Sequence, residues 1–385
     1  MPQVIYLDNN ATTRIDPRVF EAMMPFMTDY YANAASIHPF GVKAAEAIKN
    51  ARDQIVALIG CETNEIIFTS GATEAINLAL KGVAENNKAR GKHIVTVLTE
   101  HPAVLETCRY LESVGYEVTY LPVGKDGLLD LETVKQSLTP NTILVSVMLV
   151  NNETGIIQPV KEIADIAHSQ SAIFMTDATQ AVGKMPVNVE ELGVDLMSFS
   201  GHKLYGPKGV GGLYVRSKHP HKVKLTPLIH GGGQERGLRS GSLNVPGIVG
   251  LGKAAEIAQQ EMEADAKRIG ELREYLETEL LKIENTVLNG HPRKRLYNTS
   301  SICFKGVDAD AMITGLKDIA ISNGSACTSA HVEPSHVLLA MGKSREDAFS
   351  TLRFSLGKLN ARNEIEQTIK ATTIFWKKFF NIVSV

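Results

Sequence analysis

The sequence predicts an α/β protein in which a large domain with a mostly parallel sheet is joined to a smaller α+β domain. Between about residues 66 and 215, apolar runs of strand length alternate with segments of helical period, a rhythm typical of parallel sheets. A long helical stretch over about 249–283 then interrupts this rhythm, and shorter strand-like runs follow it. We therefore expect a large domain over 15–255 and a small domain formed by 1–14 and 256–385.

Each expected element rests on its hydrophobic period and its length. The expected strands of the large domain are 93–98, 118–121, 142–150, 172–176, 196–200 and 212–215, and its helices include 73–84, 103–113 and 160–168. The small domain should hold strands over 301–304 and 320–322 and a terminal helix over 365–380. We expect the aromatic residues of that helix to dock on their own domain rather than on a membrane.

Composition excludes several classes of function. The formal net charge is −2 and the basic residues are scattered, so no nucleic-acid partner is expected. The first residues lack the pattern of a signal peptide, and the most apolar run, 142–150, is too short to span a membrane, which predicts a cytoplasmic protein. The four cysteines form no CxxC pair, and His219-Pro220-His221 is interpreted as a solvated turn, so no metal site is expected.

Two expected strands deliver charged residues to the same edge of the sheet. Asp177 follows the strand 172–176, and Ser200-Gly201-His202-Lys203 follows the strand 196–200. A lysine amine there suits Schiff-base chemistry, Asp177 could keep a pyridine nitrogen protonated, and Gln180 could bind a ring hydroxyl. Taken singly, Lys203 could be a surface ammonium and Asp177 a helix cap or ion-pair partner; the buried strand and the glycines favour a site.

The segment 69–74, Thr-Ser-Gly-Ala-Thr-Glu, lies between a short strand and a helix. Free backbone N–H groups at such a helix start can bind a phosphate, and Ser200 and His202 could complete the anion site. On this segment alone, a helix cap by Ser70 or Thr73 is the favoured alternative. The neighbouring segments reverse that preference.

A thiol lies in a segment of small residues, Asn323-Gly324-Ser325-Ala326-Cys327-Thr328-Ser329. Such neighbours allow Cys327 to approach a cofactor and later meet an acceptor, and His331 could favour its thiolate. Cys61, Cys108 and Cys303 stand in apolar or helical-looking surroundings, where a buried structural thiol is expected. The amine and the thiol together indicate an enzyme that takes sulfur from an amino acid.

Along nearly its full length the chain resembles the cysteine desulfurases of the class V aminotransferase family, in the group that serves nitrogenase and iron–sulfur assembly. This resemblance implies pyridoxal-phosphate fold type I and a homodimer whose active sites lie near the subunit interface. In some relatives an extended tail engages the assembly scaffold; the sequence ends soon after Phe380 without one, so that contact is not predicted. The segments that carry the resemblance are 6–13, 69–74, 99–101, 150–155, 177–180, 200–206, 231–241 and 322–329.

The resemblance also implies a role for each site residue. Lys203 would bind pyridoxal 5'-phosphate covalently, Asp177 its ring nitrogen and Gln180 its ring oxygen, while His101 would stack on the ring and could exchange protons with the substrate. The substrate carboxylate would meet Asn152 and Arg353, although an ion pair is the alternative for Arg353. Asn152 would also contact the cofactor. Phosphate contacts would come from Ala72, Thr73, Ser200, His202 and Ser242 of the partner subunit.

The function that follows is conversion of L-cysteine to L-alanine with a persulfide on Cys327, which a sulfur-acceptor protein such as an iron–sulfur scaffold would collect. A selenocysteine lyase or an aminotransferase would keep Lys203 and Asp177, but an aminotransferase needs no Cys327 segment. A noncatalytic sulfur carrier would explain the thiol but not the cofactor residues.

Overall fold

A mostly parallel sheet of seven strands forms the centre of the protein, as the sequence predicts. The computed structural model describes residues 4–324 and 333–383. The strand order is β2-β8-β7-β6-β5-β3-β4, and β8 runs antiparallel to both its neighbours while β7, β6, β5, β3 and β4 pair in parallel. The strands are β2 (Ile66–Thr69), β3 (His93–Val97), β4 (Glu117–Leu121), β5 (Thr142–Ser146), β6 (Ile173–Asp177), β7 (Leu196–Ser200) and β8 (Gly211–Val215).

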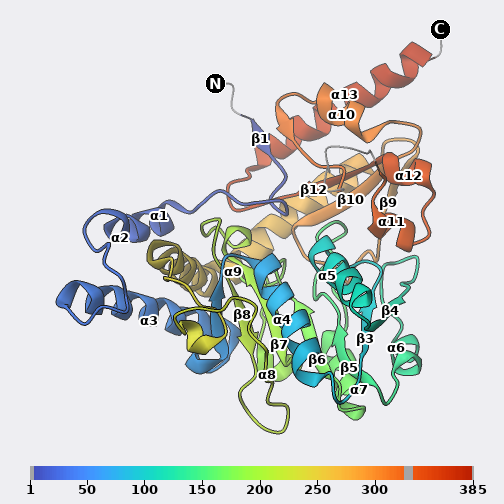
Figure 1. The fold of residues 1–385 in the computed structure, drawn as a ribbon. Helices are drawn as coiled ribbons and strands as arrows, with labels where there is room; N and C mark the ends of the chain where they lie inside the picture. The colour runs from blue at the N-terminus through green and yellow to red at the C-terminus, as the bar shows by residue number, and fades with distance from the viewer. Residues whose placement is uncertain (1–3, 325–332, 384–385) are drawn as a thin grey trace.

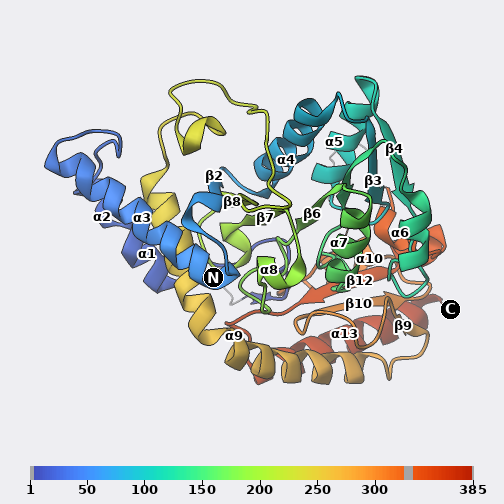
Figure 2. The same cartoon turned by 90° about the horizontal axis from the view of Figure 1, so that it is seen from below.

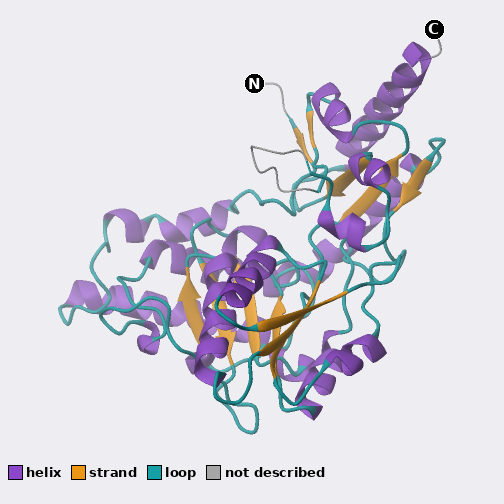
Figure 3. Cartoon of the chain, turned by 45° about the vertical axis from the view of Figure 1, so that its right-hand side comes forward, coloured by secondary structure: helices purple, strands orange, loops and turns teal. Residues whose placement is uncertain are grey.

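Helices cover both faces of this sheet (Figure 3). Successive side chains of a strand point to opposite faces, so in β2 Phe68 joins one apolar core and Ile67 the other. The first core is shared with α3 (Pro39–Ile59), α7 (Val160–Ser169) and the first part of α9 (Val245–Leu280), the second with α4 (Ala72–Asn87) and α5 (Pro102–Ser113). The shorter helices of this part are α1 (Pro17–Met23), α2 (Pro25–Thr28), α6 (Leu131–Ser137) and α8 (Val189–Leu192), with the 3-10 turns Thr63–Glu65, Gly201–Lys203 and Glu235–Gly237.

Two small sheets and the last helices form a separate group at the end of the molecule where both termini lie (Figure 1). One sheet is antiparallel with the order β12-β10-β9, and the other pairs β1 with β11 in parallel. The elements are β1 (Ile5–Tyr6), β9 (Thr286–Leu288), β10 (Thr299–Phe304), β11 (Ile319–Ala320), β12 (Thr351–Ser355), α10 (Ala309–Gly315), α11 (His336–Ala340), α12 (Arg345–Phe349) and α13 (Arg362–Val383).

Helix α9 connects the two groups of elements and runs beside α13 (Figure 2). Ile248 and Ile257 belong to a core of the large sheet, whereas Ile269 and Leu280 belong to the core of the small sheets. The chain therefore passes from one core to the other within a single helix. The domain boundary at 255/256 stays a prediction.

The structure departs from the expected elements in several places, and β1, β9, β12, α6 and α10–α12 are among the elements that were not expected. The expected strand 142–150 ends at Ser146, and the expected strand 320–322 shortens to Ile319–Ala320. Helices α1–α3 are not among the expected elements, although Pro39 begins α3 and left-handed Gly60 ends it, as local signals should. The aromatic residues of α13 do pack against the small-domain core, which confirms their expected docking. Within residues 4–324 and 333–383, no helix is long and apolar enough to cross a membrane.

Candidate active site

A cavity of about 740 Å³ opens where β6 and β7 end and α4 begins. Its wall includes the segment after β1 and one residue of β12, so both groups of elements contribute to it. Parallel strands bring their carboxyl ends to one edge of the sheet, which is why residues distant in sequence meet there. The site residues predicted from the sequence that line this cavity are Ala72, Thr73, His101, Asn152, Asp177, Gln180, Ser200, His202, Lys203 and Arg353.

Lys203 lies in the turn after β7, and its ammonium donates to the backbone carbonyls of Asn10 and Ala11. Burial, followed by the nearby positive charge of Arg353, lowers the pKa of Lys203 to about 8. A larger fraction of the amine is therefore uncharged near neutral pH than for an exposed lysine. An uncharged amine is the form that attacks a carbonyl carbon, so the setting suits covalent attachment of an aldehyde.

Asp177 ends β6 and is buried. Its Oδ1 accepts from the backbone N of Thr179 at 3.0 Å, from Ser198 Oγ at 3.1 Å and from Thr179 Oγ1. Among the residues that the structure describes, no donor is recorded on Oδ2. That oxygen is therefore available to a protonated ring nitrogen in the cavity.

In the described chain the first turn of α4 has no side-chain cap, so its backbone N–H groups are free to bind an anion. Gly71 is the N-cap residue and supplies no side-chain hydrogen bond, while Ser70 N donates to Glu74 instead, so the alternative of a cap by Ser70 or Thr73 is wrong. Ser200 Oγ lies close by: a Cβ at Gly71 would be 3.6 Å from it. The first N–H groups of α4 and this hydroxyl can thus meet a phosphate.

Two histidines in the cavity wall are held in the neutral form. Burial, then the charges of Lys203, Lys208 and Lys184, lowers the pKa of His202 to about 4. Burial also lowers the pKa of His101, whose Nδ1 accepts from Ala103 N at 3.1 Å at the start of α5. An Nδ1 that accepts leaves the ring proton on Nε2, so His101 can present an N–H to a ligand.

Arg353 of β12 is already paired. Its Nη2 donates to Asp8 Oδ1 at 2.6 Å and its Nη1 to the backbone oxygen of Asn152 at 3.0 Å. Its Nε is buried without a hydrogen-bond partner in the described chain. Arg353 therefore forms an ion pair, the alternative that the sequence left open, and Asp8 occupies part of the guanidinium that a substrate carboxylate would use.

Comparison with known proteins decides the family. The aminotransferase class-V family model matches residues 5–368. A mitochondrial cysteine desulfurase of Arthroderma benhamiae is 51% identical over 95% of this chain and 73% of that relative, and the cysteine desulfurase IscS of Rickettsia massiliae is 49% identical over 95% and 89%. A solved NifS-like protein superposes with a TM-score of 0.91 at 40% identity, covering 97% of this chain and 99% of that one. The chain belongs to the cysteine desulfurases of the class-V aminotransferase family.

The cofactor of this cysteine desulfurase is pyridoxal 5'-phosphate, and the chemistry of the cavity fits it. An amine of lowered pKa suits the aldehyde, the open Oδ2 of Asp177 suits a pyridine nitrogen, and the uncapped start of α4 suits the phosphate. These three features line one cavity.

Ser242 is the one predicted site residue in the described part of the chain that does not line the cavity. Ser242 is exposed and absent from the wall of its own chain's cavity. Cys327 lies outside the described residues, but Ser322 and Gly324, which precede its segment, line the cavity. Cys61, Cys108 and Cys303 are buried, as expected, and burial raises their thiol pKa values to about 12, about 12 and about 11. These three thiols are accordingly poor nucleophiles at neutral pH.

Sequence reasoning missed two residues next to the predicted ones. Asp8 pairs with Arg353, and Lys184 donates to the Gln180 side chain at 2.7 Å. Asp8 stands within a segment that carries the family resemblance, so its charge was a usable signal. Nothing local marks Lys184, because a lysine in a polar turn is normally exposed.

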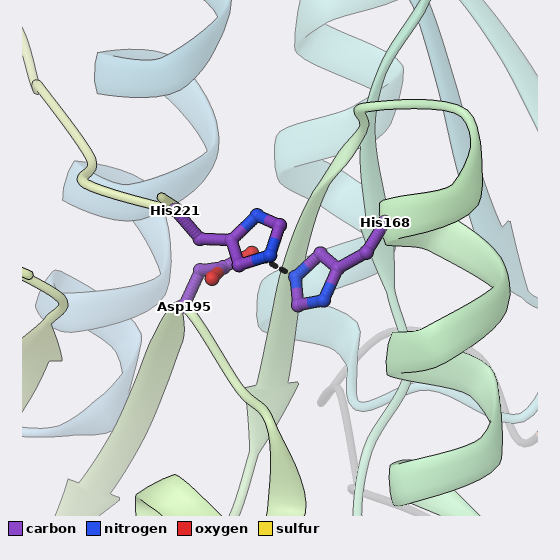
Figure 4. Close-up of side chains that lie close together, drawn as sticks. All are labelled: His168, Asp195 and His221. Atoms are coloured by element: carbon purple, nitrogen blue, oxygen red, sulfur yellow. Dashed lines mark hydrogen bonds and ion pairs between the residues drawn. The ribbon is translucent and has the colours of Figure 1, made fainter. Parts of the chain in front are cut away.

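At the opposite end of the sheet, His168, Asp195 and His221 lie close together (Figure 4). The two imidazoles stack with centroids 3.8 Å apart and planes 10° apart. His219 and Pro220 are exposed in a bend, as the expected solvated turn requires, while the His221 side chain is half-buried against His168. A metal lies in the plane of the ring that binds it, and stacked parallel rings cannot share one without turning. Asp195 Oδ2 also accepts from His168 Nε2 and Phe174 N, both at 2.8 Å, which indicates a structural cluster.

Proposed function

We propose that the protein converts L-cysteine to L-alanine and keeps the sulfur as a persulfide on Cys327. In this reaction the Cβ–S bond of the substrate breaks, the sulfur binds to Cys327 Sγ, and a proton completes the alanine. The observation that carries the proposal is the meeting of the Lys203 amine, the Asp177 carboxylate and the Arg353 guanidinium in one cavity. Ser322 and Gly324 in its wall support delivery of the following segment to that cavity.

The cavity residues divide the work around the cofactor. Bound pyridoxal phosphate withdraws electrons from the substrate Cα. Lys203 binds the cofactor covalently and, once released by the substrate amine, takes the Cα proton, a role that its lowered pKa supports. Asp177 keeps the ring nitrogen protonated, Gln180 donates to the ring oxygen, and His101 lies against the ring and holds a proton on Nε2.

The ends of the ligand are held by separate groups. Arg353 and Asn152 take the substrate carboxylate, with Asp8 as the resident carboxylate that orients the guanidinium and is displaced in part. Asn152 also contacts the cofactor. Its phosphate is bound by Ala72, Thr73, Ser200 and His202, and by Ser242 of the partner subunit.

This last contact requires a homodimer, and the surface of α1–α3 supports one. These helices project from the rest of the chain in Figures 1 and 2. Tyr31 is 75% exposed and Ile37 98% exposed. Large apolar side chains in this number favour burial against a second copy. The exposed apolar residues of this surface are Phe20, Met24, Met27, Tyr31, Ile37, Phe40 and Val42.

Light scattering on the purified enzyme tests the dimer. We expect the mass of two chains for the natural sequence and a weaker dimer for Ile37→Asp. Leu359→Asp is the matched control, because Leu359 is 62% exposed but lies outside α1–α3. A monomer that binds the cofactor at full affinity would contradict the contribution of Ser242 of the partner subunit.

We further propose that a sulfur-acceptor protein, such as an iron–sulfur scaffold, collects the persulfide sulfur, and that the enzyme works in the cytoplasm. Persulfide chemistry supports an acceptor, because a protein-bound persulfide must be discharged before the next turnover. The near-neutral charge gives no reason to expect a nucleic-acid acceptor.

The decisive assay measures alanine and sulfide from L-cysteine in the presence of a reductant. Activity should require the cofactor and should be abolished in both Lys203→Ala and Cys327→Ser. The Cys327→Ser enzyme should still bind the cofactor and show its visible absorbance. Alanine formation that survives in Cys327→Ser would instead indicate a selenocysteine lyase or a related lyase, and a protein without any cofactor band would indicate a sulfur carrier.

A further inference from the structure

A second buried lysine lies directly behind the cofactor cavity. Lys184 is 3% exposed and stands in the turns between β6 and α8. Its Nζ donates to Gln180 Oε1 at 2.7 Å, and Gln180 Nε2 donates to the backbone oxygen of Asn10 at 2.9 Å. Gln180 lines the cavity and Lys184 does not, so in the described chain the hydrogen bond to this amide links the lysine to the site.

The hydrogen bond between Lys184 and Gln180 fixes the orientation of the Gln180 amide, that is, where its oxygen and its NH2 group lie. In its charged form, below a pKa of about 7, the Lys184 ammonium has only donors, so the group that faces it is then the amide oxygen. The NH2 group then points the other way, toward the Asn10 carbonyl and the cavity. Of its two hydrogens, one is used by Asn10 in the described chain, and the other is available to a ligand.

Burial of Lys184 is energetically unfavourable, which argues for a specific role. Burying an ammonium is unfavourable unless a counter-charge accompanies it. In the part of the chain that the structure describes, no carboxylate lies within ion-pair distance of Lys184. The charged groups that act on it, Lys203 and Arg353, are both cationic and, after burial itself, lower its pKa to about 7; its charge in turn acts on His202.

We propose that Lys184 is a positioning residue that locks the Gln180 amide with its NH2 group toward the ring oxygen of the cofactor. Without this lock the amide could turn and place its own oxygen against the ring oxygen, where two acceptors repel. The ring oxygen carries negative charge when the cofactor is bound, so a fixed donor beside it stabilises that charge. The inference rests on the proposed role of Gln180 in cofactor binding.

The test is a double-mutant cycle read from the bound cofactor rather than from turnover. Lys184→Met, Gln180→Ala and the double variant are loaded with pyridoxal phosphate, and the visible absorbance is titrated with pH. A donor to the ring oxygen favours the form without the shared proton, so its loss should raise the titration midpoint, by about one pH unit in each single variant. The titration midpoint of the double variant should lie close to that of Gln180→Ala alone.

The cycle separates positioning from simple charge. If Lys184 acts by its charge alone, the two shifts will add in the double variant, and the inference is overturned. A midpoint that does not move in Lys184→Met would also overturn it. Thermal unfolding of each cofactor-free variant identifies loss of fold, and Lys253→Met, on the partly exposed side of α9, controls for removal of a lysine elsewhere.

A second variant, Gln180→Glu, supplies a test if Lys184→Met does not fold. Gln180→Glu leaves Lys184 in place and offers it a carboxylate, but presents oxygen rather than NH2 to the ring. The midpoint should then rise further than in Gln180→Ala, and an unchanged midpoint would show that position 180 does not face the ring oxygen. Failure of the proposed function looks different, because the natural sequence would then lack the cofactor band or form no alanine.

Discussion

The two ends of the central sheet use the same residue types for different purposes. At the carboxyl ends of β6 and β7, Asp177 keeps one oxygen open toward the cavity, and Lys203 contacts only backbone carbonyls. At the other end, Asp195 accepts from His168 and Phe174 and lies 3.4 Å from Arg216 Nε. The Oδ1 of Asp195 is buried without a hydrogen-bond partner in the described chain and faces Arg216, whereas the open oxygen of Asp177 lies at a cavity. A charged residue therefore indicates a ligand site when its unused bonding capacity faces a cavity, not merely when that capacity is unused.

The largest expected effect is at the cavity end. Asp177→Asn keeps the shape of the side chain but removes the charge that holds the ring nitrogen protonated, so kcat should fall by about 10³-fold while the cofactor stays bound. Turnover of L-cysteine and cofactor absorbance are measured on the same preparation. An Asp177→Asn enzyme with normal kcat would break the comparison, since Asp177 would then be a structural carboxylate like Asp195.

The matching change at the far end should affect stability and not chemistry. Asp195→Ala leaves the backbone N–H of Phe174 without its buried acceptor and removes the buried carboxylate that pairs with Arg216, so the free energy of unfolding should fall by about 3 kcal/mol. Denaturant unfolding measures this, and kcat/KM for the folded fraction should stay near that of the natural sequence. If Asp195→Ala loses turnover while its unfolding curve is unchanged, the far cluster has a function beyond structure.

A smaller effect tests whether the ion pair between Asp8 and Arg353 competes with the substrate carboxylate. In Asp8→Asn the Arg353 guanidinium keeps a polar neighbour but loses the carboxylate that competes with the substrate. The KM for L-cysteine should therefore fall by about fivefold, the size expected for the loss of one weak ion pair. Steady-state kinetics separate KM from kcat. A rise in KM would mean that Asp8 mainly orients Arg353 and is not displaced by the substrate.

A further expected effect concerns acid stability of the cofactor-free protein. Burial keeps the folded pKa of His202 at about 4, below its unfolded value of about 6.5, so the unfolded chain binds the extra proton first. Stability contributed by neutral His202 is complete above pH 6.5 and is lost as the pH falls toward 4. The fall of the unfolding midpoint over this range should be shallower in His202→Asn. His221, whose pKa burial lowers less far, is the matched control; equal pH profiles for His202→Asn and the natural sequence would contradict the prediction.

Much of this arrangement could be predicted from the sequence. β7 has the bounds expected from its apolar run, and the strand-helix rhythm correctly brings Asp177, Ser200 and Lys203 to one edge. The resemblance adds Asn152 and Arg353, which do line the same cavity. These successes share a cause, because strand ends follow from local period and parallel pairing then brings them together.

Other features depended on contacts that no local pattern contains. The partner of Arg353 is Asp8, 345 residues away, and the stacking of His221 on His168 joins a loop to the end of α7. Helix α3 is different, because its buried residues Ala44, Ile48, Ala51, Ile55 and Ile59 recur at helical spacing and were a usable local signal that the prediction missed.

Residue type and strand period are local properties, so the sequence predicts the candidate reactive groups of this desulfurase and brings Asp177 and Lys203 to one edge of the sheet. Only the tertiary structure decided which partner each charge has, and therefore which groups remain open to a ligand. Lys184 is the clearest case: its residue type suggests an exposed ammonium, but packing buries it against Gln180. Hydrogen-bond partners are chosen by the three-dimensional fold, since a buried polar atom must bond to whatever lies beside it.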